Sequence, residues 1–123
     1  PSYGPARFME GCSFVELNMP DPAQESFLLA LKDDSENAEI YFRLGLCAFR
    51  TSRFLDAETF LLAALQKAPQ HPEAHLFLAE LYWDHLGDRE RAELHARRFL
   101  AAAPADHPER ARVEARLPAP EKK

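Results

Sequence analysis

The chain has 123 residues, 46% of them apolar, and 15 basic against 20 acidic side chains give it a net charge of −5. This length allows one domain of ordinary size, and the apolar content is enough for a packed core, which argues against wholesale disorder. The acidic balance argues against a general nucleic-acid binder, and no apolar stretch reaches the ~20 residues of a membrane-spanning helix, so we expect no membrane insertion.

Apolar periodicity and helix-start signals predict an all-α chain. Seven helices are expected, near residues 5–17, 22–33, 38–51, 54–68, 72–85, 88–102 and 108–117. Proline at the first helical position marks three of these starts, in the pairs Asp21-Pro22, His71-Pro72 and His107-Pro108. Asp21 is expected to be an N-cap with Gln24 as its capping-box partner, and Asp88 is expected to cap the sixth helix.

The chain is similar to itself at an offset of ~34 residues, a length typical of two-helix repeats. Small residues coincide with small ones and large apolar residues with large ones: Gly11 with Gly45, Ala23 with Ala57, Ala30 with Ala64, Phe27 with Leu61 and Leu31 with Leu65. Glycine and alanine at these points allow two helices to approach closely. The period therefore predicts stacked helical hairpins.

The middle block carries the most complete motif, Tyr41-x2-Leu44-Gly45-x2-Ala48, followed by Ala57-x3-Leu61, Ala64 and Pro69. It resembles the tetratricopeptide repeat pattern of aromatic-x2-Leu-Gly-x2-Tyr, then Ala-x3-Phe, then Pro, with Ala48 in the tyrosine position. The resemblance covers three repeats, 4–37, 38–71 and 72–105. It implies a right-handed superhelix of helical hairpins with a C-terminal capping helix over 108–117, so that residues 1–117 form a single domain and 118–123 a disordered tail.

The first and third repeats depart from this pattern. Arg7 and Glu10 occupy two normally apolar positions of the first repeat, which is usual for a terminal repeat. In the third, Ala96 and Phe99 exchange the usual large and small residues, which we interpret as a repacking that conserves volume. The third repeat also fits only if the turn 86–88 holds one extra residue.

By this resemblance, the first helix of each repeat lines the concave wall of the superhelix, where members of the family bind partners. The candidate partner-binding residues are the side chains in the groove positions: Phe8, Met9, Cys12, Phe42, Arg43, Leu46, Phe49, Arg50, Phe77, Glu80 and Trp83. An aromatic side chain buries about 150–250 Å². The five aromatics among these residues would therefore exceed the apolar patch usual on a soluble monomer.

We expect a partner protein or peptide with apolar anchors and one acidic contact to Arg43 or Arg50, because arginine and aromatic residues are enriched at interface hot spots. The alternative is that this stripe is ordinary core, with Phe49 and Phe77 largely internal and with binding elsewhere. Co-chaperone members of the family hold a C-terminal carboxylate with lysine, asparagine and arginine on the same wall. The matching positions here contain a single basic residue, so we expect no such clamp: Phe8, Cys12, Arg43, Glu73 and Phe77.

Catalytic, metal and cofactor sites are not indicated by the sequence. Cys12 and Cys47 are too few for a disulfide framework and are predicted to be free thiols. His71 and His75 have the four-residue spacing of a helical metal site but no third ligand. No phosphate loop or nucleophile–base pair is visible, so no enzyme is expected. The remaining histidines are interpreted as bystanders in turns or on exposed faces: His85, His95 and His107.

The sequence thus predicts a non-catalytic interaction module that binds a partner peptide in an apolar, aromatic-lined groove. Small three-repeat proteins of this kind resemble bacterial secretion chaperones and pilus-assembly factors, so a bacterial assembly or secretion adaptor is a narrower expectation. The alternative is a structural fragment of a longer solenoid or a self-associating scaffold, in which a second copy fills the groove and forms a homodimer. The compartment stays open, with the cytoplasm favoured.

Overall fold

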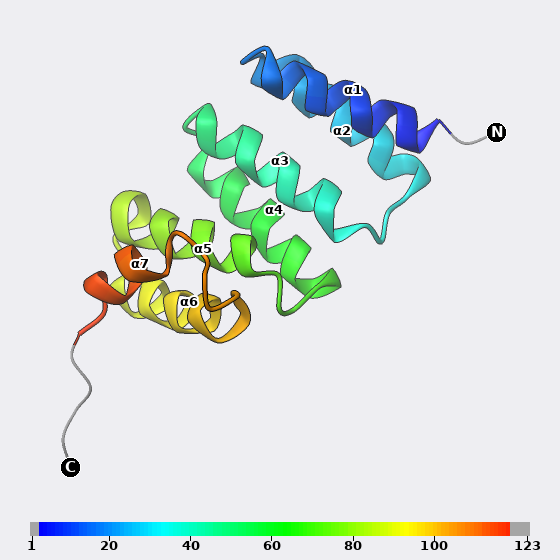
Figure 1. The fold of residues 1–123 in the computed structure, drawn as a ribbon. Helices are drawn as coiled ribbons and strands as arrows, with labels where there is room; N and C mark the ends of the chain where they lie inside the picture. Colours follow the sequence, from blue (N-terminus) through cyan, green and yellow to red (C-terminus); the bar gives the residue numbers. More distant parts are fainter. Residues whose placement is uncertain (1–2, 119–123) are drawn as a thin grey trace. The chain divides into compact units, whose positions relative to one another are not determined.

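The computed structural model describes residues 3–118, which form seven α-helices, one π-helix and no strand (Figure 1). The helices are α1 (Gly4–Glu16), α2 (Pro20–Asp33), α3 (Ala38–Arg50), α4 (Phe54–Lys67), α5 (Pro72–Leu81), the π-helix η1 (Tyr82–Leu86), α6 (Arg89–Ala102) and α7 (Arg110–Arg116). The predicted all-α class is confirmed. All of the predicted tail except Pro118 lies outside the described residues. Within residues 3–118, no helix combines the length and apolar character needed to cross a membrane.

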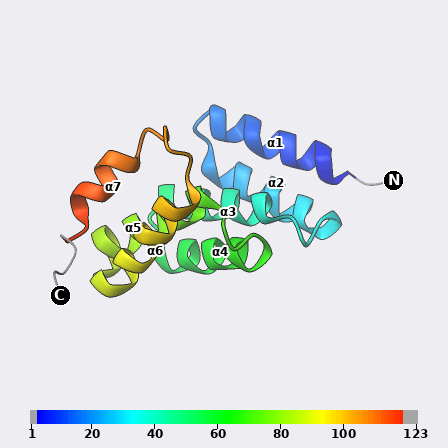
Figure 2. The ribbon, with the colours of Figure 1, turned by 60° about the horizontal axis from the view of Figure 1, so that its bottom comes forward.

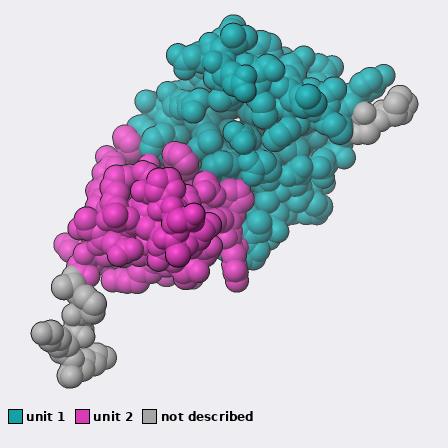
Figure 3. Space-filling model, viewed as in Figure 1, with its two compact units in different colours: residues 1–69 teal, residues 70–123 magenta. Residues whose placement is uncertain are grey.

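The chain divides into two compact units, residues 1–69 with α1 to α4 and residues 70–123 with α5 to α7 (Figure 3). In unit 1, α1 pairs with α2 and α3 pairs with α4 as helical hairpins, and α2 also packs against α3. In unit 2, α5 and η1 pair with α6, and the chain then turns back so that α7 packs against this hairpin (Figure 2). The division falls close to the expected boundary between the second and third repeats.

Glycine lies at the helix crossing of both hairpins in unit 1. A Cβ atom on Gly11 would lie 2.6 Å from the ring of Phe27, and one on Gly45 would lie 2.8 Å from the side chain of Leu61. Because Phe27 and Leu61 are fully buried, neither can move aside cheaply. The prediction that the smallest residues mark the crossings is therefore confirmed in unit 1.

Unit 2 builds the same crossing from other side chains. The counterpart of Gly45 is Ala79. Ala96 occupies the position that Leu61 has in the second repeat, and both alanines are fully buried. The side-chain volume that is missing at Ala96 is supplied one turn later by Phe99, which is buried in the same cluster together with Val113. The exchange of large and small residues is thus a repacking, as the sequence predicted.

The extra residue of the third repeat forms the π-helix. α3 begins at Ala38 and α5 at Pro72, whereas α4 begins at Phe54 and α6 at Arg89, so the second helix of the third repeat starts one position late. The additional residue lies in η1, before the left-handed turn at Gly87, which has a φ of 66°. Because a π-turn absorbs one residue within a continuous helix, α6 keeps its place beside α5. The prediction that the turn 86–88 holds this residue is therefore wrong.

Two of the predicted helix starts have different outcomes. Asp88 caps α6 as predicted, because its carboxylate accepts a hydrogen bond from the Arg91 backbone N–H at 3.0 Å. The capping box at Asp21 is wrong, because α2 begins at Pro20 and Met19 precedes it without a side-chain cap. Pro20 suits the first helical position since its φ is fixed and it has no N–H to satisfy. Asp21 consequently lies within the first turn of the helix.

The histidine–proline pairs also differ from each other. α5 begins at Pro72 as predicted, and the side chain of His71 accepts a hydrogen bond from the Ala74 backbone N–H at 3.1 Å. α7 begins two residues later than predicted, at Arg110. The Nδ1 atom of His107 accepts a hydrogen bond from the Glu109 backbone N–H at 3.1 Å, which closes a turn before the helix.

Candidate functional site

The predicted site residues of α1 are open to different degrees. Met9 is 69% exposed. Phe8 is half-buried, and its ring centroid lies 5.6 Å from that of Phe27 in the core between α1 and α2. Cys12 is also half-buried against this core. The surface of α1 therefore presents Met9 together with the outer edges of Phe8 and Cys12.

On α3 the structure corrects one predicted site residue. Phe42 is only 5% exposed and has little surface to offer a partner. Leu46 and Phe49 are half-buried, and the ring of Phe49 meets that of Phe54 edge to face at 5.9 Å. Leu46 and Phe49 thus keep part of their apolar surface accessible, whereas Phe42 is part of the core.

The two arginines of α3 have different electrostatic surroundings. The Nε atom of Arg43 donates a hydrogen bond to Glu39 Oε1 at 3.1 Å, one helical turn earlier. Arg50 is exposed at the end of α3, and within residues 3–118 no hydrogen bond or ion pair holds its guanidinium. Arg43 is therefore partly neutralised, and Arg50 is the cation of this helix that is available to a partner.

The thiols of unit 1 are free, as predicted. Cys47 is a buried residue of α3, and burial raises the pKa of its thiol, against the opposing effect of Arg50 and Arg43. A raised pKa keeps the thiol protonated and unreactive at neutral pH. Cys47 therefore serves packing, and the arrangement gives no sign of a cysteine nucleophile.

Positions one repeat apart are equivalent on α1 and α3, so that Cys12 corresponds to Leu46. We use the name α1/α3 face for the predicted site residues that keep accessible surface in unit 1: Phe8, Met9, Cys12, Arg43, Leu46, Phe49 and Arg50. A hollow of about 360 Å³ opens beside Phe8, and Ile40, Asp33 and Asp34 are among the other residues that line it. The face thus combines apolar surface, a hollow and one free cation.

The predicted site residues of unit 2 lie against α7. The carboxylate of Glu80 accepts a hydrogen bond from Arg112. The guanidinium of Arg116 lies over the Trp83 ring, 4.4 Å from its centroid. Phe77 is half-buried. Glu80 and Trp83 are thus half-buried, and the chain's own last helix occupies part of the surface that was expected to be open.

α7 is also fixed at its base by Arg110, whose Nη1 donates to the backbone oxygens of Leu100 at 2.7 Å and Ala103 at 3.1 Å. These carbonyls belong to the end of α6, where a helix leaves acceptors without partners. His107 adds a hydrogen bond to Glu73 at 3.1 Å between their Nε2 and Oε1 atoms. His107 is thus a structural residue, and its interpretation as a bystander was wrong.

Sequence reasoning also missed a buried histidine pair in unit 2. His75 on α5 and His95 on α6 are 3% and 5% exposed, and their Nδ1 atoms lie 3.0 Å apart. The ring of Tyr82 stacks on His95 with centroids 5.8 Å apart. A signal was available, because the counterparts of these histidines in the second repeat are Tyr41 and Phe60. Both histidines therefore occupy positions that hold half-buried aromatic residues in the second repeat.

The hydrogen bond of the histidine pair needs at least one neutral imidazole. A hydrogen bond between two Nδ1 atoms requires one ring to donate and the other to accept, which two imidazolium rings cannot do. Burial lowers the pKa of His95 to about 4, and the nearby charges of His75, Arg98 and Arg91 act in the same direction. The pair is consequently a polar part of the core at neutral pH.

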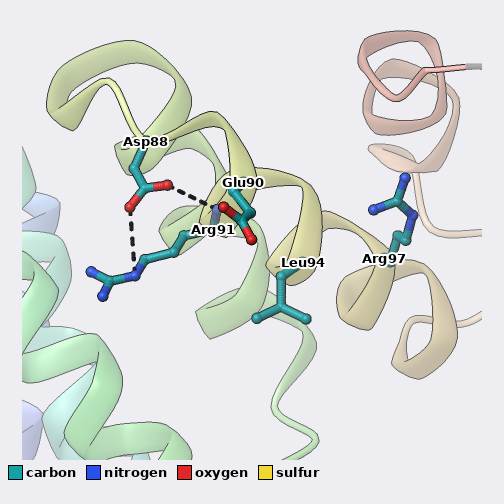
Figure 4. A pocket seen from close by; sticks show the side chains of 5 residues that line it. All are labelled: Asp88, Glu90, Arg91, Leu94 and Arg97. Carbon is teal, nitrogen blue, oxygen red and sulfur yellow. Dashed lines mark hydrogen bonds and ion pairs between the residues drawn. The ribbon is translucent and has the colours of Figure 1, made fainter.

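A second hollow, of about 600 Å³, lies along α6 (Figure 4). Its lining mixes charges of both signs with one exposed leucine: Asp88, Glu90, Arg91, Leu94 and Arg97. Asp88 is engaged in capping α6 and lies 3.5 Å from the Arg91 guanidinium, as the dashed lines show. Within residues 3–118, no three His, Cys, Asp or Glu side chains are grouped so that they could hold a metal ion.

The sequence profile of the tetratricopeptide repeat family matches residues 8–72 and 53–107 of this chain. A comparison with curated protein sequences finds no significant match. Among solved structures, the first tetratricopeptide domain of Spaghetti (RPAP3) bound to the HSP90 peptide SRMEEVD superposes with a TM-score of 0.82 at 17% identity, covering 94% of each chain.

Two further solved structures have similar folds. PcrH in complex with the chaperone binding region of PopB superposes with a TM-score of 0.82 at 23% identity, covering 93% of this chain and 94% of PcrH. MamA superposes with a TM-score of 0.79 at 22% identity, and the match covers 85% of this chain but only 60% of the MamA chain. At these identities the similarity shows the fold alone.

Proposed function

Since the chain belongs to the tetratricopeptide repeat family, we propose that it is a non-catalytic interaction module that binds a partner peptide on the α1/α3 face of unit 1. The observation that carries this proposal is the combination of accessible apolar side chains with a free guanidinium on the first helices of two successive repeats, α1 and α3. Met9, Leu46 and Phe49 supply the apolar surface, and Arg50 supplies the charge. Apolar and aromatic anchors with an adjacent arginine are typical of interface hot spots.

The chemistry of the face suggests the chemistry of the partner. A peptide with apolar side chains would cover Met9, Leu46 and Phe49, and a carboxylate of the peptide would pair with Arg50, because Arg43 is already bound by Glu39. The hollow beside Phe8 would accept one further apolar side chain, with a basic neighbour facing Asp33 and Asp34. The proposed partner is thus an apolar segment that carries at least one acidic residue.

The fold similarity to two peptide complexes supports this mode of binding, since one solved structure holds an HSP90 peptide and another holds the chaperone binding region of PopB. A clamp for a C-terminal carboxylate is not supported. Of the corresponding positions in unit 1, two are the half-buried apolar residues Phe8 and Cys12, and Arg43 is bound by Glu39. We therefore infer a role as an adaptor or chaperone for an internal segment, with bacterial secretion or assembly components as the narrower class.

Site-specific photo-crosslinking tests this proposal. A photo-reactive phenylalanine analogue at Leu46 should capture a partner in native lysate, and mass spectrometry of the adduct should identify an apolar, acid-containing segment. Leu55 on α4 is the matched control position, because it is a leucine of unit 1, 69% exposed, outside the α1/α3 face. Capture of the same segment from both positions would remove the α1/α3 face as the site.

Substitutions then measure the contribution of each part. Phe49→Glu and Arg50→Glu should each weaken binding of the identified segment by about tenfold or more, which corresponds to about 1.4 kcal/mol. Leu55→Glu and Lys32→Glu are the matched controls for the apolar and charged changes and should leave affinity within about twofold. Circular dichroism must show equal helicity, and light scattering decides whether the captured partner is a second copy, which would favour the scaffold alternative.

A further inference from the structure

The third repeat differs from the other two by a feature that the proposed function does not use. Its first helix ends in the π-helix η1, and the corresponding ends of α1 and α3 have no such turn. π-helices are rare and occur frequently at functional sites, because the inserted residue changes which side chains share a face. Here the inserted turn carries Trp83 and Asp84.

Both of these side chains meet α7. The carboxylate of Asp84 accepts two hydrogen bonds from Arg116, at 2.9 and 3.2 Å, and this pairing lowers the pKa of Asp84. The same guanidinium lies over the ring of Trp83. One turn earlier on α5, Glu80 pairs with Arg112, which is four residues before Arg116. The pairs advance in the same direction along both elements, so α7 runs parallel to α5 and η1.

α7 is attached to this surface by polar contacts together with one apolar anchor. α7 has seven residues, and Val113 is its single buried side chain. The ion pairs of Arg112 and Arg116 are partly exposed, and pairs of this kind contribute little to stability. The charge spacing therefore adds orientation and selectivity to the Val113 anchor, and another helix with one apolar side chain and the same arginine spacing could replace α7.

We propose that Glu80, Trp83 and Asp84 form a docking surface for a short basic helix with arginines four residues apart, and that α7 is the occupant of this surface in the free chain. The charge complementarity between α5–η1 and α7 carries the inference, and the π-helix places two of the three recognising residues. A partner that offers a basic helix would displace α7. This surface lies in unit 2, so its test is independent of the α1/α3 face.

Trp83 gives the test its readout, because it is the single tryptophan of the chain. The full-length variant Arg112→Glu/Arg116→Glu should release α7 and shift the emission of Trp83. A synthetic peptide of residues 108–118 should then bind this variant and return the emission to that of the wild type. The same peptide should bind the wild-type chain at least about tenfold more weakly, since α7 competes for the surface.

Two controls make the outcome decisive. Arg97→Glu/Arg98→Glu is a matched double charge reversal on α6 and should behave like the wild type. The variant Glu80→Arg/Asp84→Arg should bind a charge-reversed peptide, with glutamate at positions 112 and 116, in preference to the natural one, which keeps the test valid if the first variant is unstable. The proposal would be overturned if either variant bound the natural and the charge-reversed peptide equally. It would also be overturned if Arg112→Glu/Arg116→Glu left the emission of Trp83 unchanged.

Discussion

Acidification should weaken unit 2 through the histidine pair. His95 has a pKa of about 4 in the folded chain, because it is buried beside His75, Arg98 and Arg91, against a usual value of 6.5. Below pH 6.5 the unfolded chain therefore binds more protons than the folded one, and stability falls as the pH falls. The stability associated with a neutral His95 is fully present above pH 6.5 and is lost progressively between pH 6.5 and 4. Below pH 4 the free energy of unfolding falls no further on account of His95.

The size of the effect follows from the two pKa values. Between pH 7 and pH 5, the difference in proton binding by His95 alone lowers the free energy of unfolding by about 2 kcal/mol. With a urea dependence of about 1–3 kcal/mol/M, this loss moves the urea midpoint down by about 1 M. Trp83 emission reports the transition of unit 2, and far-ultraviolet circular dichroism reports both units.

A variant copied from the second repeat isolates the histidine pair from other titrating groups. Tyr41 and Phe60 are the counterparts of His75 and His95, so His75→Tyr/His95→Phe replaces the pair with the aromatic residues found at the same positions of the second repeat. This variant should lose about 2 kcal/mol less between pH 7 and pH 5 than the wild type does. An equal loss in both proteins would refute the reasoning, because the pH dependence would then come from other groups.

Two glycine substitutions test the helix crossing and the π-helix exit. Gly11→Ala should lower the free energy of unfolding by about 1–2 kcal/mol, because the new Cβ would lie 2.6 Å from the buried Phe27 ring. This overpacking exceeds the gain in helix propensity, so a raised melting temperature would contradict the prediction. Gly87→Ala should lower the free energy of unfolding by about 1 kcal/mol for a different reason, since φ is 66° there while nothing lies within 4 Å of the added Cβ. Chemical denaturation measures this loss.

The sequence was sufficient for the helices because their signals are local and repeated. The repeat period, the glycines at the crossings and the cap at Asp88 each depend on residues that are near one another in the sequence or one period apart. The error at the start of α2 arose where two local signals competed. Pro20 and Pro22 both suit the start of α2, and only the structure shows that the helix begins at Pro20.

The candidate site could be predicted only in part. The repeat register identifies which side chains lie on the first helix of each repeat, but exposure depends on what packs against that helix. Phe42 is therefore buried although it lies in a groove position. Glu80 and Trp83 are partly covered because α7, which follows the third repeat, carries arginines at the matching spacing.

The sequence by itself determined the all-α class, the hairpin period and the small residues at the helix crossings, because each of these repeats along the chain and is visible by comparison with itself. Only the tertiary structure decided that the extra residue forms a π-helix, that His75 and His95 are buried together, and that α7 pairs with Glu80 and Asp84. These features occur once, in the third repeat and the helix that follows it. Comparison of the repeats reveals the added residue and the histidines at two aromatic positions, but where that residue lies and which side chains meet depend on contacts between elements.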